Sequence, residues 1–133
     1  MGSGVIPSIR VRDMAGALEF YTERLGFAIK RGGAADPNCA ISRGDARVML
    51  EVARDLYGDA YNAAIRDRLG AGSASATALY IEASDIEVLY AQVTAAGVEI
   101  VDPLGDRPWG QSEFTVADPE GQWLSFWRSS GDG

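Results

Sequence analysis

The 133-residue chain contains no histidine and a single cysteine, Cys39. Without histidine there is no Ser-His-Asp triad, no imidazole general base and no histidine ligand for a metal. One cysteine can form neither an internal disulfide nor a thiolate zinc site, and a lone thiol is typical of proteins in a reducing compartment. The sequence therefore argues against triad and zinc chemistry and predicts a cytoplasmic location.

Long apolar runs and positive charge are also scarce. No run approaches the roughly 18 residues that a membrane-spanning helix needs, and Met1–Gly4 carries neither a basic segment nor an apolar signal core. The 12 basic residues are outnumbered by 19 acidic ones, for a net charge of −7. Because this charge repels phosphate backbones, we expect no nucleic-acid partner. The lack of a long apolar run predicts no membrane partner. The negative charge favours a cationic or amphipathic small molecule, although acidity also serves solubility alone.

The remaining composition is that of a folded globular protein. Hydrophobic residues make up 47% of the chain and charged residues 23%. At this length roughly two-thirds of the unfolded surface can be buried, which is enough for a core without disulfides or metals. We therefore expect a single domain over residues 1–133.

The first half of the chain is predicted to run strand, helix, strand, strand, strand. An alternating stretch over 5–11 contains Pro7, which restricts it to a sheet edge or an arm. Asp13 is a favourable N-cap for a helix over 14–24, and Gly26 ends that helix. The three further strands are predicted over 27–30, 39–42 and 47–53.

The second half repeats this order after a connector over 54–76. The connector contains a predicted short helix over 59–69 and a Gly/Ala/Ser stretch over 70–75 that is expected to be flexible. Asp85 is then placed to cap a second helix, which Gly97 ends. Strands are expected on either side of this helix and around a tight turn at Asp118–Gly121, namely over 77–83, 98–101, 112–116 and 122–128.

Two halves with the same element order indicate an internal duplication. Leu25-Gly26-Phe27 ends the first helix, and Ala96-Gly97-Val98 ends the second in the same way. We therefore predict an α+β fold of two tandem βαβββ modules, over about 5–53 and 77–128. Their curved sheets are expected to form an open barrel with the helices outside, and its concave face is a natural place for a ligand.

This pattern resembles the vicinal oxygen chelate superfamily, which includes glyoxalase I, extradiol dioxygenases and the fosfomycin and bleomycin resistance proteins. Matching segments occur over most of the chain. Within the superfamily the chain is most similar to the bleomycin resistance proteins. The most specific segment is Arg107-Pro-Trp-Gly-Gln-Ser-Glu-Phe114, which is followed by the Asp118-Pro-Glu-Gly121 turn.

The resemblance also implies where the superfamily's metal ligands would fall in this chain. Spacing from Asp13, Asp85 and the Asp118 turn places them at Ile6, Ala78, Ser125 and near Glu51. Three of these four side chains cannot hold a divalent ion as His or Glu would, and Glu51 alone would give a weak site. We therefore expect no metal and no other cofactor, which sets aside glyoxalase, dioxygenase and fosfomycin-modifying chemistry.

Aromatic residues are the main candidates for a ligand site. Trp123, Ser125 and Trp127 alternate on one face of the last predicted strand, and this face is the concave one if Ser125 occupies the old metal position. The same argument turns Tyr80 toward the cavity. Trp109 lies in a predicted loop and either stacks on a ligand or covers the core. Trp123 and Trp127 have the alternative roles of filling the barrel or lining a dimer contact.

Two carboxylates complete the predicted site. Glu82 shares a face with Tyr80, and Glu51 shares a face with Met49. Either would suit a cationic ligand beside aromatic rings. The alternatives are a surface position for Glu82 and a salt bridge with a nearby arginine for Glu51.

The resemblance implies a homodimer that binds a bulky cationic or planar small molecule and thereby keeps it from its target, with glycopeptide antibiotics of the bleomycin type as ligands. Such sequestration needs no catalytic residue. The alternative is a metal-independent isomerase, cyclase or lyase that acts on a small natural product, with Glu51, Glu82 or a tyrosine as the base. A third possibility is a filled cavity in a protein whose dimer contact alone matters.

Overall fold

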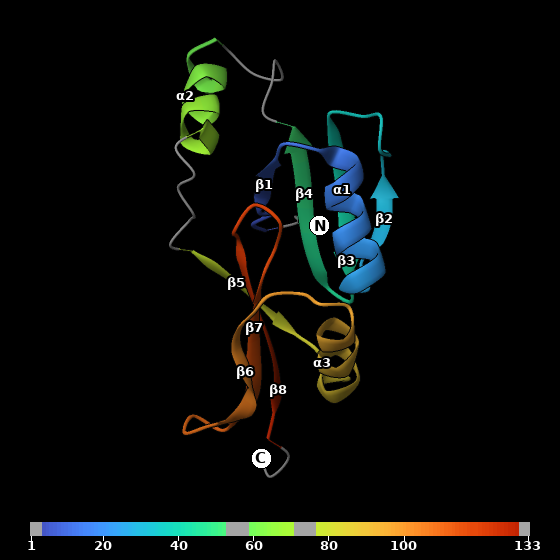
Figure 1. The fold of residues 1–133 in the computed structure, drawn as a ribbon, viewed down its shortest axis with the longest axis vertical. Helices are drawn as coiled ribbons and strands as arrows, with labels where there is room; N and C mark the ends of the chain where they lie inside the picture. Colours follow the sequence, from blue (N-terminus) through green and yellow to red (C-terminus); the bar gives the residue numbers. More distant parts are fainter. Residues whose placement is uncertain (1–3, 53–58, 71–76, 131–133) are drawn as a thin grey trace. The chain divides into compact units, whose positions relative to one another are not determined.

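The structure of the chain is a computed structural model that describes residues 4–52, 59–70 and 77–130 (Figure 1). It divides into two units, Met1–Ala74 and Ser75–Gly133. Each unit contains its own four-stranded mixed sheet and a helix packed on one sheet face. The predicted α+β fold of two βαβββ modules is thus confirmed. Within the described residues no helix is both long and apolar enough to cross a membrane.

The first unit contains a sheet in the order β1-β4-β3-β2, in which β1 runs parallel to β4 and the other pairs are antiparallel. Its strands are β1 (Ser8–Val11), β2 (Ala28–Arg31), β3 (Asn38–Arg43) and β4 (Ala46–Val52). The edge position that Pro7 predicted for the first strand is confirmed, because β1 has only β4 as a neighbour. The Pro7 carbonyl accepts a hydrogen bond from the Met49 amide at 2.9 Å.

The first helix differs from its prediction in its last turn. Asp13 is the N-cap, and its carboxylate accepts a hydrogen bond from the Gly16 amide at 3.2 Å. A single helix over 14–24 was expected, but α1 (Met14–Glu19) continues as the π-helical turn η1 (Phe20–Arg24). The Leu25 amide bonds the Phe20 carbonyl, five residues back. The wider turn accompanies complete burial of Tyr21 and Leu25, and hydrophobic spacing alone does not distinguish the two helix types.

The connector contains α2 (Asp59–Gly70), which agrees with the predicted short helix to within one residue. The rest of the stretch expected to be flexible, residues 71–75, lies outside the described residues.

The second unit repeats the first with the order β5-β8-β7-β6 and the helix α3 (Ile86–Ala95). Its strands are β5 (Ala78–Glu82), β6 (Ile100–Arg107), β7 (Gln111–Ala117) and β8 (Trp123–Ser129). The predicted strand over 98–101 was too short, because β6 continues through Pro103. Two register irregularities interrupt its pairing with β7. Because β6 is an edge strand, it tolerates Pro103, which has no backbone N–H to donate to a neighbouring strand.

Two polar features were predicted in the second unit, a tight turn at Asp118 and a helix cap at Asp85. The predicted tight turn is confirmed: the Gly121 amide bonds the Asp118 carbonyl at 2.9 Å, and the Asp118 carboxylate accepts from the Glu120 and Gln122 amides. Asp85 occupies the N-cap position of α3, but its side chain makes no capping hydrogen bond. Its backbone has ψ of 37° instead of the extended value that Asp13 adopts, and this conformation differs from that of a typical N-cap.

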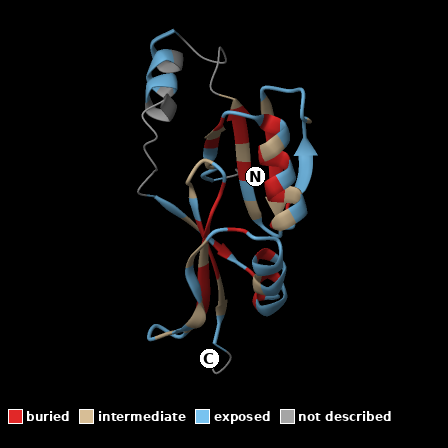
Figure 2. Ribbon diagram, in the orientation of Figure 1, coloured by how far each residue is buried: buried red, intermediate tan, exposed pale blue. Residues whose placement is uncertain are grey.

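Each sheet has one face that packs against its helix and one face that does not. In the first unit the packed face contributes the buried residues Ile9, Val11, Cys39, Ile41, Val48 and Leu50. In the second unit it contributes Ile81, Phe114, Val116, Leu124 and Phe126. Figure 2 shows these buried stretches on the strands and on the helix surfaces that meet them. The opposite faces, called here the open faces, carry the candidate functional residues.

Candidate functional site

The open face of the second sheet gathers most of the predicted site residues. Strand alternation turns Leu124 and Phe126 toward α3, where both are completely buried. It turns Trp123, Ser125 and Trp127 to the open face. The parallel pairing of β5 with β8 places Ala78, Tyr80 and Glu82 opposite these three residues in order. Five of the seven predicted residues therefore share one surface of the sheet.

Tyr80 and Trp127 form an aromatic pair on this face. Their ring centroids are 6.1 Å apart and their planes differ by 20°, which is a stacked arrangement. Tyr80 is 54% exposed and Trp123 is 45% exposed. Broad aromatic surfaces of this kind are costly to leave in water, so they indicate a place that a ligand or another protein surface covers.

Glu113 on β7 joins the aromatic pair to Trp109. Its Oε2 atom accepts a hydrogen bond from the Trp109 indole Nε1 at 2.6 Å and another from the Tyr80 hydroxyl. The Gln111 side-chain oxygen lies 3.0 Å from the same hydroxyl. Only 7% of Glu113 is exposed, and this burial raises the pKa of its carboxyl above the usual value of 4.5. The site therefore has a buried carboxylate that accepts hydrogen bonds from Trp109 and Tyr80 and lies opposite Trp127 in the strand register.

Trp109 lies in a tight turn between β6 and β7, because β6 extends to Arg107 and shortens the predicted loop. The Gly110 amide bonds the Arg107 carbonyl at 3.1 Å, and Gly110 adopts a φ of 84° that glycine tolerates. The Arg107 guanidinium donates to the Asp102 carboxylate at 2.9 Å and to the backbone carbonyl of Glu113 at 3.2 Å. These contacts hold the turn beside the sheet, so that the indole reaches Glu113 while 62% of Trp109 stays exposed.

The remaining predicted residues of this unit have different surroundings. Ser125 is 8% exposed and shares a hydrogen bond of 2.7 Å with the Thr115 hydroxyl. Glu82 is exposed at the end of β5 and lies opposite Trp127 in the strand register. Ser125 thus forms part of the polar floor of the open face, and Glu82 lies at its border.

Glu51 belongs to the first unit, and it forms the salt bridge with an arginine that the sequence analysis gave as its alternative role. It is 2% exposed, and its Oε1 atom lies 2.6 Å from the Arg10 guanidinium. The Ser8 hydroxyl donates to the same oxygen. This carboxylate is therefore already matched by a cation and a hydroxyl on the neighbouring strand β1.

Sequence reasoning missed Gln111, Glu113 and Thr115. All three alternate along β7, and the antiparallel register places Glu113 opposite Trp127 and Thr115 opposite Ser125. The same period-two alternation that identified the β8 residues could have found them, had β7 been paired with β8 in this register.

The superfamily's four metal positions do not fit a metal in this chain. The side chains of Ile6 and Ala78 have no donor atoms, the Ser125 hydroxyl is hydrogen-bonded to Thr115, and Glu51 is paired with Arg10. Among the described residues no group of three or more Cys, Asp or Glu side chains is placed to hold an ion. A divalent cation would need several oxygen or nitrogen ligands here, so these residues supply no metal chemistry.

Residues 5–126 match the Glyoxalase/Bleomycin resistance protein/Dioxygenase superfamily. The chain belongs to this superfamily. Its predicted resemblance is thereby confirmed, and the paired βαβββ modules are the form that the superfamily fold takes here. Among curated protein sequences no significant match is found.

Solved structures with the same fold cover nearly the whole chain. TioX from Micromonospora sp. ML1 is similar, with a TM-score of 0.73, 24% identity and coverage of 96% of this chain and 99% of TioX. UcmS2 has a TM-score of 0.68 and 25% identity over 92% of this chain and 95% of its own. The bleomycin-binding protein of Streptomyces verticillus, in complex with copper(II)-bleomycin, has a TM-score of 0.61 and 24% identity over 97% of this chain and 96% of its own.

Proposed function

We propose that this superfamily member is a metal-free binding protein that sequesters a bulky cationic or aromatic antibiotic of the bleomycin type. The observation that carries the proposal is the open face of the second sheet, where Tyr80, Trp127 and Trp109 surround the buried carboxylate of Glu113. A planar ring system can stack on the exposed aromatic surfaces, and a cationic group can pair with the carboxylate. Neither interaction requires a chemical change in the bound molecule.

The energetics favour a guest with both features. Stacked aromatic pairs contribute about 0.5–1.5 kcal/mol beyond the burial of their area. A charge-assisted hydrogen bond to a carboxylate contributes roughly 1.5–3 kcal/mol. A cation brought to Glu113 would also offset the cost of burying its charge. The structure of a bleomycin-binding protein with the same fold supports bleomycin as the first ligand to test.

The first test is isothermal titration of the protein with metal-free bleomycin and with copper(II)-bleomycin. We expect saturable binding near one ligand per chain, and we expect Trp127→Leu to weaken it roughly tenfold because the stacking partner of Tyr80 is lost. Tyr90→Phe is the matched control, since Tyr90 contacts Phe114 on the packed side of the sheet. Absence of binding at high ligand excess rejects bleomycin as the ligand, and unchanged binding by Trp127→Leu rejects this face as the site.

One observation favours a second function, that of a metal-independent isomerase, cyclase or lyase. Burial raises the pKa of the Glu113 carboxyl, which makes its carboxylate a stronger base, and the Tyr80 hydroxyl is hydrogen-bonded to it. Turnover of a small natural product that is abolished in Glu113→Gln and kept in Glu82→Gln would support this function over sequestration.

A further inference from the structure

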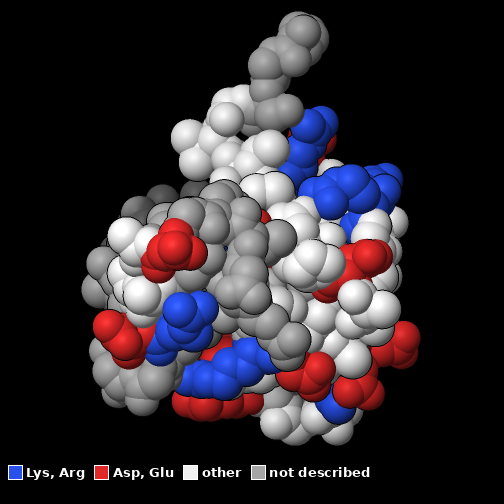
Figure 3. Space-filling view, turned by 90° about the horizontal axis from the view of Figure 1, so that it is seen from above, with Lys and Arg blue, Asp and Glu red and all other residues white. Residues whose placement is uncertain are grey.

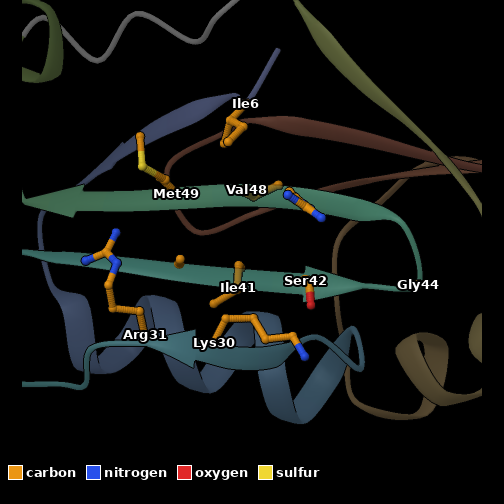
Figure 4. A pocket seen from close by; sticks show the side chains of 10 residues that line it. Ile6, Lys30, Arg31, Ile41, Ser42, Gly44, Val48 and Met49 are labelled. Carbon is orange, nitrogen blue, oxygen red and sulfur yellow. The ribbon is translucent and has the colours of Figure 1, made fainter. Parts of the chain in front are cut away.

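A hollow of about 550 Å³ lies on the open face of the first sheet (Figure 4). Its apolar lining on this face comes from Ile6, Ala40 and Met49, and Ser42 contributes a hydroxyl. A volume of this size is typical of sites for small organic molecules. The hollow is lined by residues of the first unit alone, so it is distinct from the aromatic face of the second sheet.

The charged side chains that line the hollow are all basic. Lys30, Arg31 and Arg47 contribute to it, and none of its ten described lining residues is acidic. The chain as a whole carries a net charge of −7, and on the face drawn in Figure 3 acidic and basic side chains are interspersed. An all-basic lining in an acidic protein therefore gives this hollow a local preference for anions.

A β-bulge places two of these cations side by side on the same face. Ile29 pairs with Ile41 and Arg31 pairs with Ala40, so that Lys30 is the extra residue of β2. In a regular strand Lys30 and Arg31 would point to opposite faces. Both line the hollow here, and bulges commonly redirect a side chain in this way beside binding sites.

Arg31 is held in place within this arrangement. Its guanidinium donates to the Asn38 side-chain oxygen, and the Asn38 amide lies 4.0 Å from the Met49 sulfur. Figure 4 shows Arg31 extending from β2 across β3, while Lys30 runs along β2 toward the end of the hollow where Ser42 lies. A guanidinium that uses one of its five donors on Asn38 retains others for an anion.

We propose that this hollow binds an amphiphilic organic anion, with its carboxylate or phosphate on Lys30 and Arg31 and its apolar body on Ile6, Ala40 and Met49. The site needs neither the aromatic face nor the sequestration function of the second unit. It selects against cationic molecules, and it therefore takes the opposite ligand class from the one proposed for Glu113.

The probes for this site are hexanoate, hexanol, hexylammonium and inorganic phosphate, each titrated into ¹⁵N-labelled full-length protein and followed by amide chemical shifts. We expect hexanoate to saturate shifts on β3 and β4 around Ser42 and Met49. Hexylammonium should leave these amides unchanged, and hexanol and phosphate should each bind more weakly than hexanoate because each lacks one of the two interactions. Equal affinity for hexanoate and hexylammonium would overturn the proposal, as would saturation on the second sheet only.

Charge variants test the two cations directly. The Lys30→Ala/Arg31→Ala double variant should bind hexanoate about tenfold more weakly, as expected for loss of a charge-assisted contact. The Lys30→Arg/Arg31→Lys variant keeps the charges and should stay within about threefold of the parent. Arg12→Ala/Arg66→Ala removes the same net charge from exposed residues outside the hollow and should leave hexanoate binding intact. Unchanged binding by the alanine double variant, with its fold confirmed by the amide spectrum, refutes the assignment.

Discussion

At the scale of single residues, Glu113 links stability to pH. Burial raises the pKa of its carboxyl above 4.5, even though Trp109 and Tyr80 both donate hydrogen bonds to it. A carboxyl with a raised pKa in the folded state binds its proton more tightly there than in the unfolded chain. The free energy of unfolding therefore falls as the pH rises from about 4.5 through the raised pKa.

Glu113→Gln should remove this dependence and keep an oxygen that accepts both hydrogen bonds. We expect the variant to be as stable as the parent at low pH and more stable at neutral pH, by about 1.4 kcal/mol for each tenfold increase in proton affinity that burial causes. Denaturant unfolding between pH 4 and 8 measures this difference. We also expect roughly tenfold weaker binding of a cationic guest, because the charge is lost.

Glu82→Gln is the control for this prediction, because Glu82 is exposed on the same sheet. It should leave the pH profile of stability as it is in the parent. A Glu113→Gln profile that runs parallel to that of the parent would show that the carboxyl is not desolvated in solution.

Residue positions on strands were predictable, and their contacts were not. The alternation along β8 placed Trp123, Ser125 and Trp127 on one face, which the structure bears out. The sequence did not single out Glu113, because its burial depends on β7 lying between β6 and β8 and on the indole of Trp109 reaching it. Pairing of distant strands decides such contacts, and a single sequence contains no direct record of that pairing.

At the scale of elements, substitution of Gly32 tests how closely β2 and β3 approach each other, and Gly44 is the comparison site. Gly32 ends β2 with a φ of 90°, and a Cβ atom there would lie 2.8 Å from the Asn38 carbonyl oxygen and 2.8 Å from the Cys39 sulfur. Gly44, in the turn between β3 and β4, has a φ of 56°, and a Cβ atom added to Gly44 would have no atom within 4 Å. Gly44→Ala should therefore cost about 1 kcal/mol from backbone strain alone.

Gly32→Ala should cost more than Gly44→Ala, by roughly 1–3 kcal/mol, because a backbone carbonyl cannot move aside as a flexible side chain can. Thermal or urea unfolding of both variants gives the difference. Equal losses for the two variants would mean that β2 and β3 separate easily at this point.

Element order was predictable throughout, and local irregularity was not. Asp13, Gly26 and the Asp118 turn marked boundaries that the structure confirms, because caps and turns depend on neighbouring residues. The π-helical turn at Phe20–Arg24, the bulge at Lys30 and the extension of β6 were missed. Each of these depends on how an element packs or pairs with another, which local spacing does not encode.

At the scale of the whole molecule, Trp123 favours the homodimer that the sequence analysis expects. Trp123 is 45% exposed in the single chain, and it lies four residues along β8 from Trp127, outside the aromatic group that surrounds Glu113. A stable interface buries about 800 Å² on each partner, roughly a tenth of the 7653 Å² surface of this chain. Aromatic side chains are enriched in the centres of such interfaces.

We therefore predict that sedimentation equilibrium at micromolar concentration gives twice the chain mass of 14.1 kDa. Trp123→Glu places a charge on the open face of the second sheet and should shift the protein toward the monomer, because a buried unpaired charge is costly. Val88→Glu is the matched control, since Val88 is 60% exposed on α3, which packs on the opposite face of the sheet. A parent protein of 14.1 kDa would exclude the dimer, and dissociation by Val88→Glu instead of Trp123→Glu would place the contact on the helix side. In the latter case the aromatic face would remain open in the dimer, and only a ligand would be left to cover it.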